Sequence, residues 1–472
     1  MDRIAGIETE YGCLTLESAS SRGLEAWPLL VKNHLFKTAR LGAIDLHYRD
    51  YEEPPGNGGF LRNGGRLYLD MGHLEYASPE CRSVRDMVAY DLAGDRMIQQ
   101  ALNELGAGDS VSFLKNNIDH HTGATFGCHE NYLMHRRTEF RPEAIGGLLS
   151  FLATRQIFTG TGRVGSARVT AFQYESTRSE EPVDFQISQR ADHIVNDVYQ
   201  WVQFNRAIIN ARDEPLADER KFRRLHLLIG DSNMSPYATA LKVGLTALVL
   251  KLLEEDCLPR QVALFDAVAA TQSISHECSV QTIVRLVDGQ CRTALEIQHA
   301  FYETAHRHLA GRDEETDWLL ANWRFVLEAL EYKPQALLGG VDWISKKWLL
   351  EAFRDEEGLG WDDPWLESLD LEYHNLNPEK GLFFAVEASG EIARFNQNAF
   401  FDAAFTQPPQ DTRAAGRGIA IAQFIGEEDY LVNWDSISNA RGAILEMPDP
   451  LKDYRSSVRD FLKHRRVAPM GD

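Results

Sequence analysis

Hydrophobic and polar residues alternate with a period of two from residue 66 to residue 77, with a break at Met71-Gly72. This period is typical of β-strands that have one apolar face. If Met71-Gly72 is a two-residue hairpin turn, Asp70 lies opposite His73, and Tyr68 lies opposite Glu75. The polar face of this predicted hairpin carries Arg66, Tyr68, Asp70, His73 and Glu75. The other face carries four large apolar side chains that can pack against a core, namely Leu67, Leu69, Leu74 and Tyr76.

The polar face of the hairpin has two interpretations. A strand is often polar on one side for solubility alone, and such faces mix Lys, Thr, Ser and Glu. This face instead gathers a guanidinium, a phenol, two carboxylates and an imidazole, a combination that is typical of functional sites. The alternation by itself leaves both interpretations open.

Residues 4–11 predict a further strand, in which Glu8 and Glu10 point the same way. Two carboxylates on one strand face repel each other unless a cation or an arginine lies between them. An exposed edge strand with solubilising glutamates is the alternative. The strand becomes part of a site if Glu8 and Glu75 converge.

Helical patterns follow at residues 23–41, 84–105 and 142–158, and residues 49–59 have the composition of a loop. An apolar strand at residues 225–230 precedes a helix that Ser235 can cap, with Pro236 at its first position. Residues 279–350 are expected to be mostly helical. The stretch Gln407-Pro408-Pro409-Gln410 marks a break in the helical pattern, after which a smaller C-terminal unit begins.

Composition narrows the class of protein. The 472 residues carry a net charge of −21, which argues against a general nucleic-acid binder because polyanion binding needs clustered Lys and Arg. The six cysteines contain no C-x-x-C pair, so reduced thiols are expected and a structural zinc site is not. No signal segment and no apolar run of membrane-spanning length are recognisable, so a cytoplasmic protein without a membrane partner is expected.

Outside the hairpin, several polar residues are ambiguous. His129 and Asn131 lie in a dense polar stretch, where His129 is either a metal or phosphate ligand or a structural residue. Arg223, Arg224 and His226 are either phosphate contacts or surface charges. The glycine-rich stretch 159–165 matches neither a P-loop nor a dinucleotide-binding fingerprint.

Seven motifs follow one another along the chain: Gly-Ile-Glu-Thr-Glu-Tyr-Gly at 6–12, Arg-Leu-Tyr-Leu-Asp at 66–70, Glu-Tyr-Ala-Ser-Pro-Glu-Cys at 75–81, Lys-Asn-Asn at 115–117, Cys-His-Glu-Asn-Tyr-Leu at 128–133, Asn-Ala-Arg-Asp-Glu-Pro at 210–215 and Gly-Asp-Ser-Asn-Met-Ser at 230–235. In this order they resemble the Pup ligase and depupylase family (PafA and Dop). The resemblance covers nearly the whole chain.

The resemblance implies an α+β, glutamine-synthetase-like fold of the carboxylate–amine ligases. Its curved, mostly antiparallel sheet is backed by helices and holds ATP and Mg²⁺ on the concave face. We expect a catalytic domain at residues 1–400 and a small C-terminal domain at residues 401–472.

The resemblance also implies roles for individual residues. The metal-binding positions match Glu8, Tyr68 and Glu75, and Glu10 is expected to reach a second ion; hard oxygen ligands of this kind suit magnesium. The ATP-contacting positions match Arg66, Ser78 and Trp434. Asp70 matches the catalytic aspartate.

The expected reaction is ATP- and Mg²⁺-dependent cleavage of the isopeptide bond between a Pup-like modifier and a substrate lysine. Within the family the chain is similar to the depupylase branch, because Glu75 follows Asp70 by five residues, whereas ligases have one residue more. Stretches at 161–165, 342–343, 380–382 and 434–436 also resemble that branch. One departure is the short stretch 49–59, where depupylases usually carry a long insertion.

Three alternatives remain: the ligase that attaches the modifier, a small-molecule carboxylate–amine ligase, and a catalytically silent homologue. The intact carboxylates argue against the last. The implied partners are the modifier, its protein conjugates and, indirectly, the proteasome pathway. The resemblance further implies deamidation of the modifier's C-terminal glutamine. A disordered acidic modifier needs a basic track, for which the candidates are Arg155, Arg163, Arg190, Arg206 and Arg212.

Overall fold

The computed structural model describes residues 1–463, apart from residues 2, 17–22, 24, 50–52, 121, 167–182, 201–205, 391–398 and 440. Its centre is a ten-stranded sheet in the order β10-β11-β12-β7-β1-β5-β4-β3-β2, with β6 paired to β1. The strands are β1 (Ala5–Thr15), β2 (Gly42–Ile44), β3 (Gly58–Leu61), β4 (Arg66–Asp70), β5 (His73–Ala77), β6 (Val111–Leu114), β7 (Cys128–His135), β10 (Asn196–Tyr199), β11 (Ala207–Asn210) and β12 (Phe222–Leu227). All neighbours are antiparallel except β10 and β11, which confirms the expected mostly antiparallel sheet.

The hairpin of β4 and β5 has the register that the sequence predicts. Asp70 pairs with His73, and Tyr68 pairs with Glu75. Met71 and Gly72 have φ of 44° and 92°. Positive φ at both central residues is the requirement of a two-residue hairpin turn of type I′. On the opposite face Leu67, Leu74 and Tyr76 are buried in the main core, so the alternation separates a packed face from a polar one.

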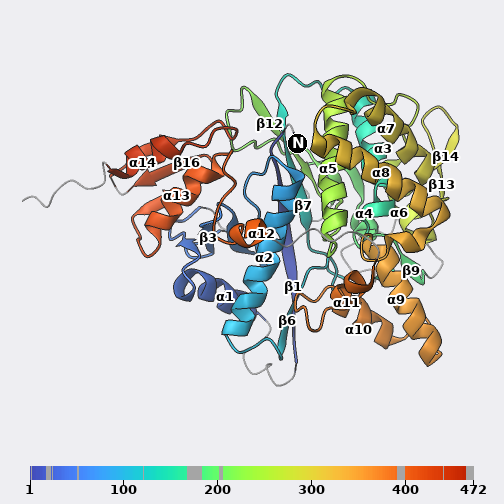
Figure 1. Ribbon diagram of the computed structural model, residues 1–472, viewed down its shortest axis with the longest axis horizontal. Coiled ribbons are helices and arrows are strands. Elements are labelled where there is room, and N and C mark those ends of the chain that lie inside the picture. The colour runs from blue at the N-terminus through green and yellow to red at the C-terminus, as the bar shows by residue number, and fades with distance from the viewer. Residues whose placement is uncertain are drawn as a thin grey trace, which may run out of the picture.

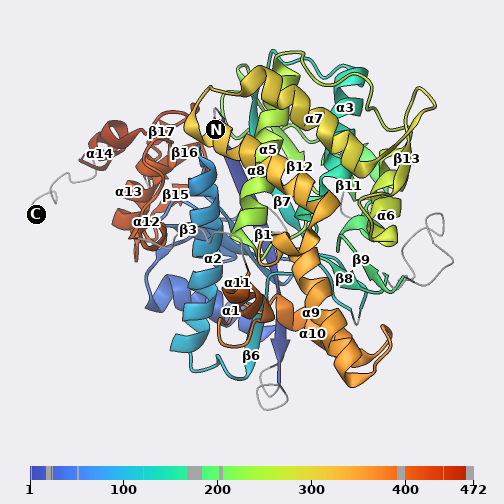
Figure 2. The same ribbon diagram turned by 45° about the vertical axis from the view of Figure 1, so that its right-hand side comes forward.

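Helices cover the apolar side of the sheet. The helix α2 (Val84–Glu104) lies beside β1, and α5 (Pro236–Glu254) packs on α2, as Figures 1 and 2 show. Around them lie α1 (Ala26–Asn33, continued as a π-helix His34–Thr38), α3 (Pro142–Thr154), α4 (Gln156–Thr159), α6 (Ala267–Glu277), α7 (Ala294–Leu309), α8 (Glu314–Tyr332), α9 (Asp342–Glu357), α10 (Pro364–Tyr373) and α11 (Leu382–Ser389). Near the glycine-rich stretch lie two strands of two residues each, β8 (Arg163–Val164) and β9 (Phe185–Gln186), and a 3₁₀ turn at Ala191–His193. Another 3₁₀ turn spans Pro334–Leu337.

The helix α5 begins as predicted. The side chain of Ser235 accepts a hydrogen bond from the backbone N–H of Ala238, and Pro236 is the first helical residue. By length and composition α5 could cross a membrane, whereas no such segment was expected from the sequence. Yet 94% of its most apolar window is buried inside the protein. It therefore packs as the central helix of a globular core.

Residues 279–350 are mostly helical, as predicted, because α7, α8 and the start of α9 lie there. They also contain a β-hairpin that the sequence did not predict, formed by β13 (Ile283–Arg285) and β14 (Cys291–Thr293), next to α6 (Figure 2). Val284 and Leu286 are buried, whereas Ile283 and Val287 are exposed, so this segment has the period of a strand. Gly289, with φ of 84°, closes the turn.

The C-terminal segment has a second, smaller core. The segment comprises α12 (Ala399–Ala403), α13 (Ala414–Phe424), a three-stranded sheet of β15 (Tyr430–Val432), β16 (Ser436–Asn439) and β17 (Ile444–Glu446), and α14 (Arg455–Lys463). Buried residues of α13, β15, β16 and α14, together with Met447 just after β17, pack with Phe60 of β3. Phe401 of α12 belongs to the main core. In Figure 1 this segment lies at the left, beside β3 and on the far side of α2 from α7 and α8.

Candidate active site

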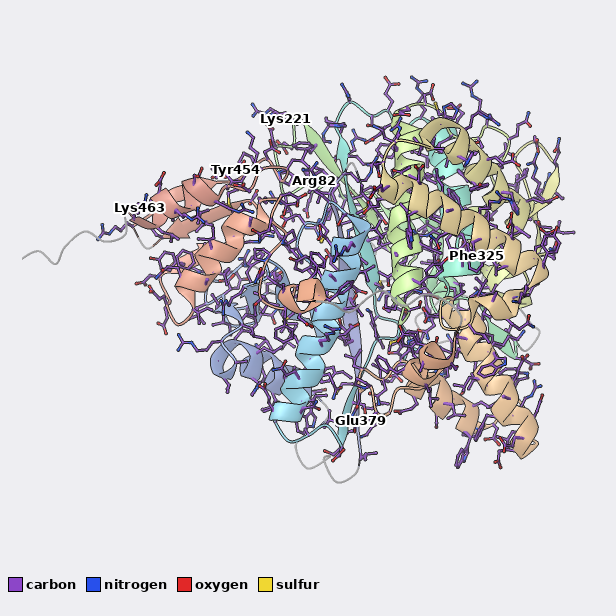
Figure 3. The ribbon with its side chains drawn as sticks, in the orientation of Figure 1. Arg82, Lys221, Phe325, Glu379, Tyr454 and Lys463 are labelled. Carbon is purple, nitrogen blue, oxygen red and sulfur yellow. The ribbon has the colours of Figure 1, made fainter. Side chains whose placement is uncertain are left out.

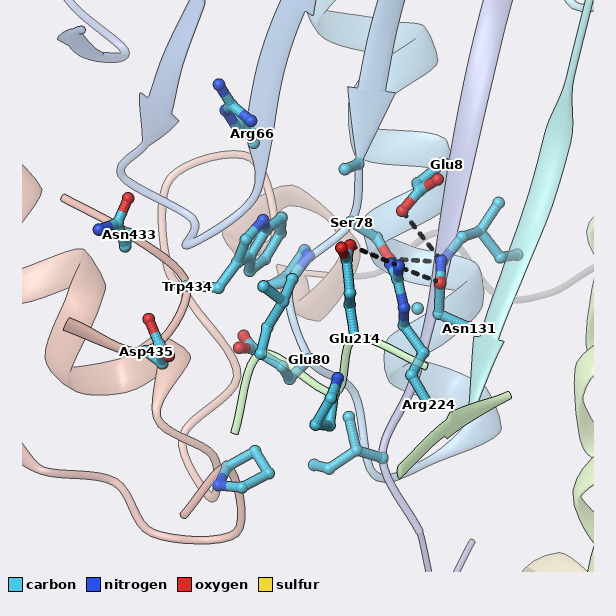
Figure 4. Close-up of a pocket in the computed structure, with 18 of the residues that line it drawn as sticks. Glu8, Arg66, Ser78, Glu80, Asn131, Glu214, Arg224, Asn433, Trp434 and Asp435 are labelled. Atoms are coloured by element: carbon cyan, nitrogen blue, oxygen red, sulfur yellow. Dashed lines mark hydrogen bonds and ion pairs between the residues drawn. The ribbon is translucent and has the colours of Figure 1, made fainter. Parts of the chain in front are cut away.

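A cavity of about 640 Å³ lies between the central sheet and the C-terminal segment. Its walls come from β1, β4, the residues that follow β5, the middle of β7, residues 212–216 and residues 433–435. Figure 4 shows Trp434 and Asn433 on one side, Glu8 and Asn131 on the other, and Arg66 above them. A volume of roughly 300–1,000 Å³ is typical of small-molecule and cofactor sites.

Arg66 supplies a fixed positive charge to this cavity. It is 8% exposed, and its Nη1 and Nη2 atoms donate to the two carboxylate oxygens of Glu53 at 3.2 and 2.6 Å. Burial alone lowers the pKa of Arg66, but the hydrogen bonds and charge of Glu53 raise it above its ordinary value. The guanidinium also lies 4.8 Å from the centre of the Tyr68 ring. A planar guanidinium held in this way can bind phosphate through two parallel hydrogen bonds.

Trp434 presents an aromatic ring to the same cavity. Phe60 packs edge-on against it, with ring centres 5.0 Å apart, and the guanidinium of Arg417 lies 4.7 Å from the ring centre. Arg417 Nη1 also donates to the backbone carbonyl of Trp434 at 2.9 Å. Ser78 lines the cavity as well, and its Oγ accepts a hydrogen bond from the N–H of Ile7 at 2.9 Å.

The first group of possible metal ligands is Glu10, Asp70 and Glu75, whose ligand oxygens all lie within 4.8 Å of one another. The register places Glu10 directly opposite Glu75, and the Tyr68 hydroxyl donates to Glu75 at 2.5 Å. Burial raises the pKa of Glu75 well above its usual range, and the charges of Glu10 and Glu8 raise it further. Three close carboxylates with one held protonated fit a divalent cation, which would replace that proton.

The second group is Glu8, His129 and His226, whose ligand atoms also lie within 4.8 Å of one another. Glu8 Oε2 is 3.4 Å from His129 Nδ1 and 3.9 Å from His226 Nε2, and Asn131 donates to Glu8 Oε1 at 3.0 Å. Within the described residues, both ring nitrogens of His226 and the Nε2 atom of His129 have no hydrogen-bond partner, although they are buried. Buried nitrogens without a hydrogen-bond partner are typical of a ligand site. Imidazole nitrogens and a carboxylate are common metal ligands, so this second group could also bind a cation.

The charges around the second group support the same interpretation. Burial lowers the pKa of His226 to about 3, against the opposing charge of Glu8, so this imidazole is neutral at pH 7. Burial would raise the pKa of Glu8, but the hydrogen bond of His129 and the charges of His226, His129 and Arg224 lower it to about 2. A neutral imidazole beside an ionised carboxylate is the form in which both bind metals.

The remaining predicted residues lie around this centre. His73 stacks on Phe126 with ring centres 4.8 Å apart, beside Asp70 on the same hairpin. Arg206 donates to the Thr125 carbonyl at 3.1 Å, and burial lowers its pKa although Glu10 and Asp70 are close enough to raise it. Arg212 lines the cavity and pairs with Glu214 at 2.7 Å.

Three of the five arginines proposed for a basic track are buried, and for these the prediction was wrong. Arg155 is 2% exposed and forms a salt bridge with Glu130. Arg163 is 4% exposed, and Arg190 is fully buried, where it donates to backbone carbonyls of Phe126 and Leu228 at 2.8 and 2.9 Å. These guanidinium groups are buried against other parts of the protein, so they cannot line a surface groove.

Arg224, which the sequence left as either a phosphate contact or a surface charge, lines the cavity, and its Nη1 lies 3.4 Å from Asn131 Oδ1. Other residues at the cavity were not predicted to belong to a site. Glu53 fixes Arg66. Glu80 and Arg417 support Trp434 from behind. These pairs are separated by 13 to 337 residues, so no local pattern indicates them. The acidic residue Glu53 in a loop of mixed polarity was the one available signal.

A cavity with a buried arginine and an aromatic ring, beside two cation-ligand groups, has the features of an enzyme site. The comparisons with known proteins agree. Residues 3–438 match the family described as Pup-ligase protein. A depupylase of Acidothermus cellulolyticus is 36% identical, over 99% of this chain and 98% of the relative. A Pup–protein ligase of Acidimicrobium ferrooxidans is 40% identical, over 92% of this chain and 91% of the relative.

Two solved structures are similar over most of the chain. One is the complex between the prokaryotic ubiquitin-like protein Pup and its ligase PafA, with a TM-score of 0.82 and 32% identity, covering 98% of this chain and 91% of that one. The other is the Pup ligase PafA in complex with ADP, with a TM-score of 0.76 and 33% identity, covering 93% of each chain. The chain belongs to the Pup ligase and depupylase family. The expected α+β fold, a mostly antiparallel sheet backed by helices, is confirmed, and the protein is an enzyme of this family.

Proposed function

We propose that this protein is the hydrolase of the family, which cleaves the isopeptide bond between a Pup-like modifier and a substrate lysine. The observation that carries the proposal is the two-residue turn of β4 and β5. This turn places Glu75 five residues after Asp70, the spacing by which the sequence resembles the depupylase branch. The same site would deamidate the modifier's C-terminal glutamine, because an isopeptide and a side-chain amide present the same carbonyl.

Each residue of the cavity has its own role in this proposal. Arg66 and Trp434 would hold the nucleotide, and Ser78 would line its site. Mg²⁺, when bound by Glu10 and Glu75 or by Glu8 with its two histidines, would neutralise the nucleotide's phosphates. Tyr68, through its hydrogen bond to Glu75, fixes the direction of that carboxylate.

Asp70 is the proposed catalytic residue. It lines the cavity, it is half-buried, and it lies at the end of β4 beside Glu10 and Glu75. Its carboxylate would take a proton from an attacking water, or would itself attack the carbonyl. In both routes the carbon–nitrogen bond breaks, and the lysine amine leaves with a proton that comes from water. In the second route a water then hydrolyses the aspartyl anhydride, which releases the modifier and restores the Asp70 carboxylate. Arg206, which is close to both Glu10 and Asp70, would offset the negative charge of the cluster.

The second candidate function is the ligase reaction. It is favoured by the similarity to PafA structures and to several Pup–protein ligases. In that direction ATP would phosphorylate the modifier's terminal carboxylate, and Asp70 would accept the proton of the incoming lysine amine. The two reactions use one set of residues in opposite directions.

The partners in this proposal are a Pup-like modifier and its protein conjugates, with the proteasome pathway involved indirectly. A cytoplasmic location without nucleic-acid or membrane partners fits the acidic chain and the burial of α5. We also propose that residues 1–400 form the catalytic domain and residues 401–472 the small one. The separate core of the C-terminal segment supports that division.

The Asp70→Asn variant tests the role of the aspartate. We expect it to bind nucleotide with unchanged affinity, because Arg66 and Trp434 remain, and to lose isopeptide cleavage by at least about 100-fold. Cleavage of a purified conjugate is followed by mass analysis, and nucleotide binding by calorimetry. Cleavage at the wild-type rate by Asp70→Asn would contradict the assignment.

A further inference from the structure

A second cavity, of about 310 Å³, lies on the C-terminal segment and shares no lining residue with the first. Its floor is one face of α13, with Ala415, Gly418, Ile419 and Ala422. Residues 406–410 form one wall. Three arginines, Arg62, Arg455 and Arg459, complete the lining. We call this concave surface the arginine groove.

The three arginines come from distant parts of the chain. Arg62 belongs to the turn between β3 and β4, whereas Arg455 and Arg459 lie one helical turn apart on α14. Their convergence is a property of the folded protein, because about 390 residues separate the turn from the helix. In Figure 3, α14 lies at the left of the molecule, between the labels of Tyr454, which precedes the helix, and Lys463, its last residue.

The positive charge of the groove is only partly compensated. Among the described residues, Arg62 and Arg459 are exposed and form no ion pair. Arg455 Nη2 donates to the carbonyl and to the side chain of Gln410, which fixes its guanidinium, and its Nη1 is 3.9 Å from Asp453. The nearby Asp460 is paired with Lys463. Three arginines around one small cavity repel each other, so an anion bound between them would be stabilised.

The floor of the groove indicates what kind of anion fits. Ala415, Ile419 and Ala422 are apolar, and Pro408 adds a further apolar wall. A small phosphate compound would contact the arginines and leave this floor uncovered. A peptide with carboxylates on either side of an aliphatic side chain would use both, since the aliphatic group packs on α13 and the carboxylates meet the arginines.

We propose that the arginine groove binds an acidic peptide segment that carries at least one aliphatic side chain. The groove is separate from the reacting residues, so the proposal is independent of the direction of the reaction. It is nevertheless close to the nucleotide site, because the Gly64 carbonyl, in the same turn as Arg62, accepts hydrogen bonds from Arg417. Binding here would hold an acidic partner on the C-terminal segment while the reaction takes place in the first cavity.

The test uses the full chain, saturated with ADP, and a fluorescein-labelled peptide of alternating glutamates and leucines. The double variant Arg62→Glu, Arg459→Glu is compared with wild type by fluorescence anisotropy. A matched control, Arg260→Glu with Arg441→Glu, reverses the same number of charges at exposed sites outside both cavities. The ADP affinity of each variant, measured by calorimetry, reports whether the fold is intact.

We expect the groove variant to bind the peptide at least about tenfold more weakly than wild type, the control variant to bind it unchanged, and a glutamine-for-glutamate peptide not to bind. Equal binding by wild type and the groove variant would overturn the proposal, and so would no binding by wild type. Displacement of the peptide by inorganic triphosphate but not by unlabelled peptide would also overturn it, because the groove would then be a phosphate site.

Discussion

The ring of Trp434 lines the 640 Å³ cavity, and other side chains hold the ring from behind. Phe60 and Arg417 contact it, and Arg417 also binds its backbone carbonyl. A ring fixed in this way loses little conformational freedom when a purine base stacks on it, so most of the stacking energy appears as affinity.

We therefore expect Trp434→Ala to weaken nucleotide binding by about tenfold or more, since stacking of a base on an aromatic ring contributes roughly 1–3 kcal/mol. Trp365→Ala is the control, because Trp365 is 65% exposed on α10 and does not line the cavity. Calorimetry with ADP measures both affinities. Equal affinities of the two variants would show that Trp434 does not contact the base.

Glu75 gives a pH-dependent prediction. Burial, Glu10 and Glu8 raise the pKa of its carboxyl, so the cation-free fold favours the protonated form. A cation needs the ionised form, and its binding therefore releases a proton and strengthens as pH rises. The same raised pKa means that the cation-free fold loses stability as pH rises through it.

We expect Glu75→Gln to bind Mg²⁺ at least about tenfold more weakly and to lose the proton release, while its cation-free form unfolds at a higher temperature than wild type at pH 8. Calorimetry in two buffers of different ionisation enthalpy measures the proton release, and thermal unfolding with chelator measures the stability. Magnesium binding that is independent of pH in the wild-type protein would contradict this account.

The candidate site could be predicted from sequence where its residues are local. The period-two alternation identified Arg66, Tyr68, Asp70 and Glu75 on one face, and the structure brings them together with Glu8 and Glu10. The supporting residues could not be predicted. Arg155 and Arg190 show why: the sequence does not reveal whether an arginine will face solvent or will be buried against a glutamate, as Arg155 is, or against backbone carbonyls, as Arg190 is.

At the scale of elements, one buried ion cluster attaches the C-terminal segment to the catalytic sheet. Glu80, just after β5, accepts hydrogen bonds from Arg413 Nε at 2.6 Å and from Arg417 Nη1 at 3.1 Å. Burial would raise the pKa of Glu80, but the two arginines lower it to about 2. The stability that this carboxylate contributes is present above pH 4.5 and is lost as pH falls towards 2.

The variant Glu80→Gln should therefore lower the free energy of unfolding by about 3–5 kcal/mol, because it leaves two buried guanidinium groups without their anion. It should also weaken ADP binding, since Arg417 supports Trp434. The control is Glu379→Gln, an exposed glutamate far from the cluster at the bottom of Figure 3. Denaturant unfolding with and without ADP checks both effects. An unchanged ADP affinity in folded Glu80→Gln would show that the ion cluster does not contribute to ADP binding.

Elements with strong local signals were predictable, and others were not. The cap of α5 at Ser235 and the turn at Met71-Gly72 could be predicted because serine, proline and glycine favour particular backbone conformations. The hairpin of β13 and β14 was missed, because its strands have three residues each and lie between long helices. The exposed Ile283 and Val287 are as apolar as the buried Val284 and Leu286, so the sequence shows no alternation of polar and apolar residues there.

At the scale of the whole molecule, β1 organises the site because it lies between β5 and β7. Glu8 faces the histidines of β7 and β12, whereas Glu10 faces Glu75 of β5. One strand therefore contributes a carboxylate to each cation-ligand group. The C-terminal segment closes the cavity from the other side with Trp434. The order of the strands, which no local pattern reveals, is what brings these residues together.

The direction of the reaction is the central claim, and one measurement tests it most directly. The purified protein is incubated with ATP, Mg²⁺, a conjugate that carries an isotopically heavy modifier, free light modifier ending in glutamate, and an unmodified acceptor protein. Mass analysis then follows both forms. We predict the release of heavy modifier, absent without nucleotide and absent in Asp70→Asn, and no attachment of the light one. Light modifier joined to acceptor lysines, with the heavy conjugate intact, would contradict the account and make the protein a ligase.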